Sequence, residues 1–247
     1  TPGFSGVDPM TRLLAIDTTG DYCSLALKDD DCVLQCHQNL PRQHARQVLP
    51  LLDQLFAESG WAKTSLDAVV YGRGPGSFTG IRIAAGIAQG IALGADCGVI
   101  PVSTLQTLAM EACAADPDAS QLWVALDARM RELYVARYQV EQGLPVLQGE
   151  ESLLSPDQLP EPPAMENRSA FRLAGNGWQT DYGFIDAWVA CLAQQAPSLM
   201  LPRAIWGAEL ALALLQRDPT VSVAPEHALP VYLRDKVTWD NKPKVGE

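Results

Sequence analysis

The sequence predicts an α/β protein built from two lobes of similar topology. Short apolar stretches with strand-like composition alternate with longer stretches of helical periodicity over the first half of the chain. The pattern then restarts, because residues 122–127, like residues 13–17, form an apolar run that ends in an aspartate before a polar turn. A strand followed by aspartate and a turn is common, so this echo could also arise by chance.

The first half of the chain reads as three consecutive strands followed by alternating helices and strands. The acidic run at 29–31 provides a turn between the second and third strands. Pro50 should kink the first helix, and Ser103 should cap the third. The expected strands are residues 13–16, 23–27, 32–37, 67–71 and 98–102, and the expected helices are residues 42–56, 79–94 and 104–115.

The second half is expected to contain strands at 122–127, 133–140 and 171–174 and an Ala/Leu-rich helix at 204–216. Residues 153–168 are rich in proline and acid and read as an irregular connection. We therefore divide the chain into an N-terminal lobe, residues 10–115, and a C-terminal lobe, residues 116–247, which ends in an extended tail. Residues 1–9 read as an artificial extension before a natural start at Met10.

Composition excludes several classes of function. The 247 residues are 47% hydrophobic, which suffices for packed cores, and the formal net charge is −11. Nucleic-acid binding depends largely on Lys and Arg, so we do not expect this chain to hold RNA alone. No apolar run reaches the roughly 18 residues of a membrane span. Six cysteines without a C-x-x-C pair indicate free thiols and a cytoplasmic location.

The glycine-rich segment at residues 72–80 joins an expected strand to an expected helix. Unpaired amides at such a junction often bind phosphate. The segment nevertheless lacks the lysine of a P-loop, and Thr79 stands where the dinucleotide motif needs its third glycine. Pro75 breaks the nucleophile-elbow pattern around Ser77. The other interpretation is a tight turn in which Ser77 or Thr79 caps the next helix.

Three glycines mark one face of the helix that follows. Gly86, Gly90 and Gly94 recur every four residues, and each costs about 1 kcal/mol relative to alanine in a helix interior. Such a face indicates that another element approaches the backbone closely. The spacing alone does not decide between a neighbour inside the protein, such as the sheet, and a helix of another protein.

Catalytic and metal-binding patterns are sparse. The three histidines do not form a pair at the spacing of a helical metal site, so no metal site and no catalytic residue is predicted. Asp17 and Asp127 could hold magnesium or activate a hydroxyl if they face a cleft between the lobes. Asp17 has no nearby lysine or glycine-rich phosphate clamp, which counts against that role.

Several segments together resemble the bacterial TsaB (YeaZ) family. The most specific is Gly-Pro-Gly-Ser-Phe-Thr-Gly-Ile-Arg at residues 74–82, and the weaker matches are residues 14–19, 24–27, 127–134, the helix from 42 to 55 and Tyr-Leu-Arg at 232–234. The resemblance implies the two-lobed actin-like, sugar-kinase and Hsp70 ATPase (ASKHA) fold, in which each lobe is a mixed sheet flanked by helices. It spans residues 10 to about 241.

The resemblance also implies a function. TsaB is similar to TsaD, which uses a histidine-bound metal and threonylcarbamoyl-adenylate to modify adenosine 37 of tRNAs that read ANN codons. The helix at 104–115 lacks the histidine pair of that relative. The chain is then expected to be a non-catalytic partner of TsaD that assembles with TsaE, pairs with itself when TsaD is absent, and meets tRNA only through the complex, with no membrane partner.

Two sets of site residues follow from the resemblance. The first is a partner interface on the two long helices, formed by His44, Val48, Leu52, Phe56, Ile83, Gly86, Ile87, Gly90, Ile91 and Gly94. The second is a vestigial nucleotide cleft, formed by Asp17, Thr18, Asp127, Gly175 and Gly177. No tightly bound cofactor is expected, only weak ATP or ADP with magnesium at the interface of the complex. The alternatives are an active ATPase or kinase of the same fold and, less favoured, a metalloprotease.

Overall fold

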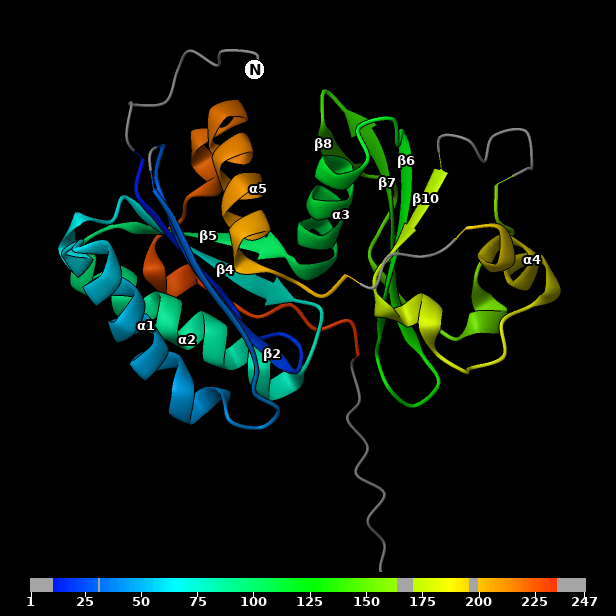
Figure 1. Ribbon diagram of the computed structural model, residues 1–247, viewed down its shortest axis with the longest axis horizontal. Helices are drawn as coiled ribbons and strands as arrows, with labels where there is room; N and C mark the ends of the chain where they lie inside the picture. Colours follow the sequence, from blue (N-terminus) through cyan, green and yellow to red (C-terminus); the bar gives the residue numbers. More distant parts are fainter. Residues whose placement is uncertain (1–10, 31, 164–170, 196–199, 235–247) are drawn as a thin grey trace, which may run out of the picture.

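The computed structural model describes residues 11–30, 32–163, 171–195 and 200–234, which form two lobes side by side (Figure 1). The predicted extension at 1–9 and the tail beyond residue 234 lie outside the described residues, as does the end of the predicted irregular connection at 164–168. Each lobe contains one mixed sheet with helices on its faces, so the predicted ASKHA fold class is confirmed.

The first lobe is organised around a five-stranded sheet. The antiparallel meander predicted from the sequence is present as β1, β2 and β3. β4 pairs in parallel with β1, and β5 pairs in parallel with β4, which gives the order β3-β2-β1-β4-β5. The strands are β1 (Leu13–Asp17), β2 (Tyr22–Lys28), β3 (Val33–Asn39), β4 (Ala68–Gly74) and β5 (Gly98–Ser103).

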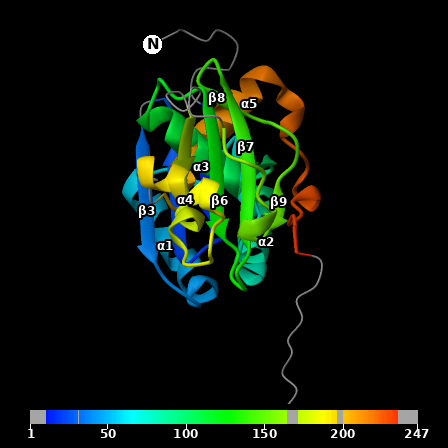
Figure 2. The same cartoon turned by 90° about the vertical axis from the view of Figure 1, so that its right-hand side faces the viewer.

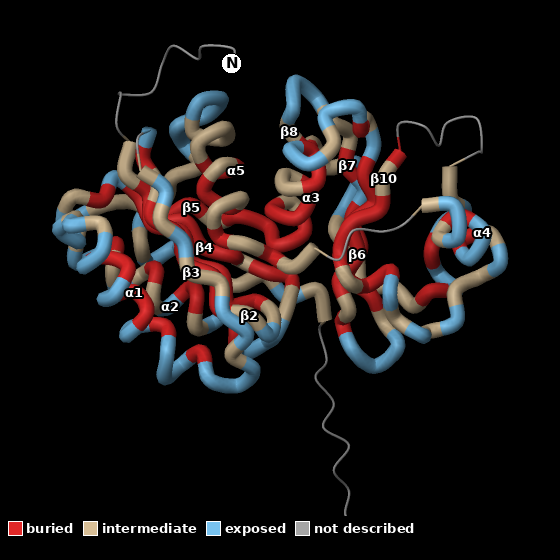
Figure 3. Tube along the Cα trace, in the orientation of Figure 1, coloured by how far each residue is buried: buried red, intermediate tan, exposed pale blue. Residues whose placement is uncertain are grey.

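Helices cover both faces of this sheet because its central strands are apolar on both sides. α1 (His44–Ser59) and α2 (Phe78–Ala95) pack on one face, where Leu14 and Ile16 point. α5 (Ala204–Arg217) covers the opposite face, where the alternate residues of β1 point. The buried residues therefore lie in the strands and on the inner sides of the helices (Figure 3).

The second lobe repeats the connectivity of the first. β6, β7 and β8 form an antiparallel meander, β10 pairs in parallel with β6, and β9 pairs with β7. These strands are β6 (Gln121–Asp127), β7 (Leu133–Glu141), β8 (Leu144–Leu147), β9 (Ser152–Leu154) and β10 (Phe171–Ala174). Because β1, β2, β3 and β4 have the same arrangement, the echo read from the sequence reflects a repeated fold.

α3 (Thr104–Ala115) packs on the inner face of the second sheet and contacts α5 of the first lobe. Ser103 caps α3 as predicted, since its hydroxyl accepts from the backbone N–H of Leu105 and Gln106. α4 (Asp186–Gln194) lies on the outer side of the second lobe, toward the viewer in Figure 2. Short 3₁₀ helices occupy Lys63–Ser65, Pro156–Gln158, Asn176–Gln179, Pro219–Val221 and Pro225–His227.

The predicted boundary between the lobes needs a correction. Residues 116–247 were all assigned to the second lobe, but α5 packs against β1, β2, β4 and β5 of the first sheet. Val223 pairs with Val99 of β5, and the hydroxyl of Tyr71 donates to the carbonyl of Leu229. The chain therefore returns to the first lobe after α4, which the local pattern of α5 could not reveal.

Among the residues that the structure describes, one helix is long and apolar enough to cross a membrane by length and composition. This differs from the prediction that no apolar run reaches that length. This helix is α2, whose 18 residues have a mean hydropathy of 1.3 and of which 33% are buried. Ala84, Ala88 and Ala92 of α2 pack in the core beneath the first sheet. α2 is thus a helix packed on a globular lobe, and only about a third of it is buried there.

Candidate functional site

A cleft of about 670 Å³ separates the two lobes. The turn after β1 forms one wall together with Gly76 and Ser77 at the start of α2. The end of β6, from Leu126 to Arg129, forms the other wall. The cleft thus lies beyond the carboxyl ends of β1 and β6, where ligands bind in many α/β proteins.

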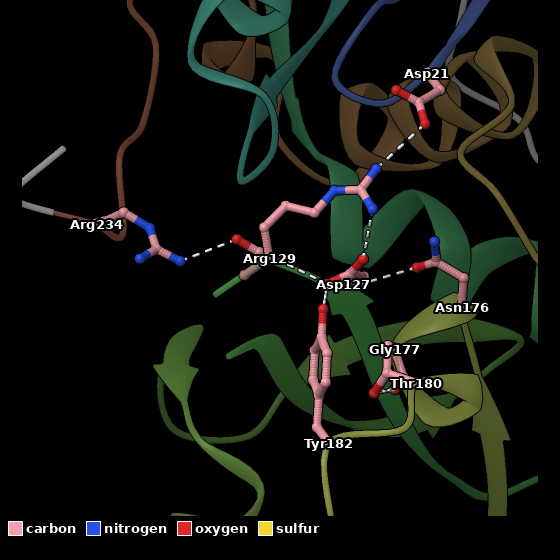
Figure 4. Close-up of polar contacts among 9 residues, drawn as sticks. Asp21, Asp127, Arg129, Asn176, Gly177, Thr180, Tyr182 and Arg234 are labelled. Carbon is pink, nitrogen blue, oxygen red and sulfur yellow. Dashed lines mark hydrogen bonds and ion pairs between the residues drawn. The ribbon is translucent and has the colours of Figure 1, made fainter. Parts of the chain in front are cut away.

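Asp127 lines this cleft, but donors of the chain itself occupy both of its carboxylate oxygens (Figure 4). Oδ1 accepts from the backbone N–H of Arg129 at 2.8 Å and from the hydroxyl of Tyr182 at 2.7 Å. Oδ2 lies 3.1 Å from Nη1 of Arg129, whose Nη2 reaches Oδ2 of Asp21 in the first lobe at 3.4 Å. The Arg129 guanidinium therefore bridges two carboxylates from opposite lobes, in the place where a phosphate or a metal would need room.

The turn that carries Arg129 has an unusual backbone. Arg129, Met130 and Arg131 have φ of 62°, 57° and 60°. Left-handed conformation costs non-glycine residues roughly 1–2 kcal/mol each, so surrounding contacts must hold the turn. Arg131 donates to the carbonyl of Tyr182 at 2.7 Å, and Arg234 donates to the carbonyl of Ala128 at 2.9 Å.

Asp17 does not share the cleft with Asp127. Its side chain is buried behind the wall, and its Oδ1 accepts from the backbone N–H of Thr19 at 2.9 Å and from the Thr19 hydroxyl at 2.7 Å. Burial raises the pKa of Asp17 to about 6. Thr18 is also buried and donates to the carbonyl of Gly80. Of the predicted carboxylate pair, only Asp127 lines the cleft.

Gly175 and Gly177 have a structural role behind the cleft. A Cβ on Gly175, where φ is +96°, would lie 2.2 Å from the carbonyl oxygen of Ala125. A Cβ on Gly177 would lie 2.8 Å from the carbonyl carbon of that residue. Between them, Asn176 lines the cleft and accepts from the backbone N–H of Asp127 at 3.1 Å. Sequence reasoning missed Arg129 as a cleft residue, and it missed Tyr182, which donates to Asp127 without lining the cleft itself.

The glycine-rich turn before α2 packs against the turn after β1. A Cβ on Gly80 would lie 1.9 Å from the Thr18 carbonyl oxygen, and the backbone N–H of Ser77 donates to the carbonyl of Thr19 at 2.7 Å. Ser77 is the N-cap of α2, since its hydroxyl accepts from the backbone N–H of Gly80. The helix-cap interpretation of Ser77 is therefore confirmed, and contact between two turns explains glycine at position 80.

The glycine face of α2 is open. Gly86, Gly90 and Gly94 are exposed, and a Cβ built on any of them meets no atom of the described residues within 4 Å. The predicted alternative of a neighbour inside the protein is therefore wrong. Beside this face, Ile83, Ile87 and Ile91 are partly buried against the core of the first lobe. We call Gly86, Gly90, Gly94 and these three isoleucines the open face of α2.

The predicted interface residues of α1 are wrong. Val48, Leu52 and Phe56 are 0%, 1% and 5% exposed and pack in the core against the first sheet. His44 is 7% exposed and lines the cleft between the lobes, so none of the four lies on an open side of α1. The outer side of α1 instead presents Leu49, which is 54% exposed, among polar residues. The apolar periodicity located a helix correctly, but it marked the side that faces the core.

The comparisons with known proteins agree with one another. Residues 38–227 match the family model described as TsaD: tRNA N6-adenosine threonylcarbamoyltransferase. The protein named tRNA threonylcarbamoyladenosine biosynthesis protein TsaB from Escherichia coli is 40% identical over 237 residues, which cover 94% of this chain and 98% of that protein. The protein of the same name from Haemophilus influenzae is 36% identical and covers 94% of this chain and 97% of its own length.

Solved structures agree as well. A crystal structure of an uncharacterized protein with similarity to peptidase YEAZ from Pseudomonas aeruginosa superposes with a TM-score of 0.80 at 36% identity, covering 91% of this chain and 100% of that one. The structure named YeaZ from the same organism gives a TM-score of 0.76 at 35% identity. The chain therefore belongs to the TsaB (YeaZ) family, whose members are tRNA threonylcarbamoyladenosine biosynthesis proteins.

Proposed function

We propose that this chain is a non-catalytic partner of TsaD in forming the threonylcarbamoyl group on N6 of adenosine 37 in tRNAs that read ANN codons. The observation that carries the proposal is the open face of α2. Glycines at three consecutive i, i+4 positions cost helix stability of about 1 kcal/mol each, and no residue in the described part of the chain fills the space that they leave. A helix of another protein could approach this backbone closely.

The character of α2 supports a protein partner. The mean hydropathy of α2 is 1.3, yet only 33% of its residues are buried. An apolar surface is therefore left uncovered in the isolated chain. Large uncovered apolar surfaces on globular proteins mark interaction sites. The match to the TsaD family model and the shared fold make a TsaD-type protein the natural counterpart. The same surface would pair two copies of this chain when TsaD is absent.

The cleft supports a role without catalysis. Arg129 and Tyr182 occupy the carboxylate oxygens of Asp127, and Asp17 lies outside the cleft. An ATPase of this fold would need free carboxylates for magnesium. We therefore keep the proposal that the chain alone binds no nucleotide tightly and that weak ATP or ADP with magnesium belongs to the interface of the complex. Calorimetric titration with Mg-ATP tests this point, and micromolar binding by the isolated chain would favour the ATPase alternative.

Charge supports an indirect role toward tRNA. With a net charge of −11, the chain should repel RNA phosphates at most surfaces. In the proposed assembly, TsaD and TsaE supply the chemistry and the RNA contacts, and this chain organises them in the cytoplasm.

Gly90→Leu tests the proposal. A leucine at position 90 has room in the isolated fold but fills the space reserved for the partner, so co-purification with TsaD should be lost. Circular dichroism and the thermal unfolding midpoint should stay near those of the unmodified chain. Ala190→Leu adds the same side chain to an exposed position of α4 and should bind normally.

Activity provides the second readout. Reconstituted adenosine modification should require the unmodified chain, accept Ala190→Leu, and fall to the level without the chain for Gly90→Leu. Normal TsaD binding and modification with a folded Gly90→Leu protein would contradict the proposal.

A further inference from the structure

The structure brings together side chains from two distant sequence segments, Phe78 and Arg82 from the Phe-Thr-Gly-Ile-Arg at 78–82 and Tyr232 from the Tyr-Leu-Arg at 232–234. The Arg82 guanidinium carbon lies 3.6 Å from the ring centroid of Phe78 and 5.3 Å from that of Tyr232. The two rings are 5.3 Å apart. We call Phe78, Arg82 and Tyr232 the arginine–aromatic cluster.

This cluster is exposed and without an ionic partner. Phe78 is 45% exposed and Tyr232 is 37% exposed, although large aromatic side chains usually lie inside. Within the described ranges, no carboxylate pairs with Arg82, whereas Arg73, Arg129 and Arg234 each have one. The rings fix the guanidinium in place and leave its N–H edges for an acceptor from outside.

The cluster is fixed from both sides of Tyr232. The backbone N–H of Val231 donates to the carbonyl of Arg73 in the first lobe at 2.8 Å. Arg234 binds Oε2 of Glu132 in the second lobe at 2.6 Å. Tyr232 is thus held against Phe78 before any partner arrives, and a preorganised contact loses less conformational entropy on binding.

The cluster also continues the open face of α2. Phe78 and Arg82 precede the three glycines in the same i, i+4 row, and every member of that row is exposed. Rows of this spacing form the ridges and grooves by which helices pack. A helix lying in the glycine groove would therefore pass beside Arg82 at one end.

We propose that Arg82, held between Phe78 and Tyr232, binds a carboxylate of the TsaD-type partner helix that covers the open face of α2. Arginine and aromatic residues are the side chains most enriched among those that dominate binding energy. A carboxylate matches the planar fork of the guanidinium and the lack of an internal counter-ion. This inference rests on the proposed function, because it names the charge of the same partner.

Binding of purified TsaD to the intact chain tests the inference. Arg82→Gln should raise the dissociation constant about 30-fold, as for a dominant interface residue, and should reduce its dependence on salt. Arg82→Lys should recover only part of the affinity, because an ammonium group cannot make the paired contacts. Arg217→Gln, an exposed arginine on α5, should bind as the unmodified chain does. Thermal unfolding of every variant shows that it is folded.

A second variant tests the aromatic rings that hold Arg82 rather than the charge of Arg82. Tyr232→Leu keeps Arg82 but removes one of the two rings that hold it. The dissociation constant should rise about 5- to 10-fold, more than for Arg217→Gln and less than for Arg82→Gln.

The contradicting results separate the two proposals. Suppose that Arg82→Gln binds TsaD within about twofold of normal while Gly90→Leu abolishes binding. That result would contradict the proposed role of Arg82 and leave the proposed function standing. If Arg82→Gln lost affinity but bound with the same salt dependence as the unmodified chain, the proposed carboxylate partner would be contradicted. Weakened self-association with normal TsaD binding would make a second copy of this chain the occupant instead. Normal TsaD binding by Gly90→Leu would contradict the proposed function itself.

Discussion

Asp17 is a buried carboxylate that the fold holds at the end of β1. Burial raises its pKa to about 6 from the usual 3.8, although two hydrogen bonds from Thr19 work in the opposite direction. A carboxyl whose folded pKa is raised favours the folded state when protonated. Its contribution to stability is therefore fully present below about pH 4 and is lost as the pH rises through about 6.

Asp17→Asn should remove this pH dependence. The amide oxygen can still accept from Thr19 but carries no charge, so the variant should gain stability relative to the unmodified chain as the pH rises. The gain between about pH 3.5 and 8 should be on the order of 2–3 kcal/mol, since each pKa unit corresponds to about 1.4 kcal/mol. Urea unfolding at a series of pH values measures it. Asp53 is exposed on α1, so the stability of Asp53→Asn should vary with pH as that of the unmodified chain does. A parallel curve for Asp17→Asn would contradict the account.

At the scale of elements, α2 contains glycines of two kinds. A Cβ on Gly80 would collide with the Thr18 carbonyl oxygen, so the fold requires glycine there. Gly86, Gly90 and Gly94 leave open space on the outer side, so the isolated fold has no use for them. The first kind serves contact between two turns of this chain, and we ascribe the second to contact with a partner.

Alanine substitutions should separate the two kinds. Gly80→Ala forces a Cβ against backbone and should destabilise by about 1–3 kcal/mol or more, as overpacking does. Gly90→Ala should stabilise by about 0.5–1 kcal/mol through helix propensity. The free energies of unfolding in urea give both values. A loss of stability for Gly90→Ala would mean that position 90 is packed in the isolated chain after all.

At the scale of the whole molecule, ion pairs that differ greatly in exposure join one lobe to the other. Glu151, whose side chain is 7% exposed, follows β8 and lies 3.3 Å from Nη2 of Arg73 on β4. The hydroxyl of Ser103 also donates to Glu151. By contrast, the Arg129 and Asp21 side chains of another interlobe pair are 73% and 61% exposed.

Glu151→Ala should therefore cost far more than Asp21→Ala. Removing a buried carboxylate leaves Arg73 and Ser103 without their partner, and we expect a loss of about 2–3 kcal/mol. Removing an exposed carboxylate should change stability by less than about 1 kcal/mol. Urea unfolding of the two variants side by side provides the comparison. Equal losses would show that the buried pair does not hold the lobes together.

The sequence predicted most elements of the fold, because apolar periodicity and turn residues are local properties. It missed β8, whose Pro145 weakens the strand pattern, and α4, which has only nine residues. It also missed β9, a three-residue strand that overlaps the start of the connection predicted to be irregular. Periodicity also shows that a helix has an apolar side without showing what that side meets. The interface that the family resemblance implied therefore included Val48 and Leu52, which pack in the core. The contacts of Asp127 with Tyr182 and Asn176 span 55 and 49 residues, and no local pattern encodes them.

The central claim is that the outer side of α2 is kept bare for a TsaD-type partner. Hydrogen–deuterium exchange of the intact chain, measured with and without purified TsaD, tests it most directly. The account predicts slower exchange in peptides covering Phe78–Ala95 and no change in peptides covering α4. Unchanged exchange over α2 in a saturated complex, with protection elsewhere, would contradict it.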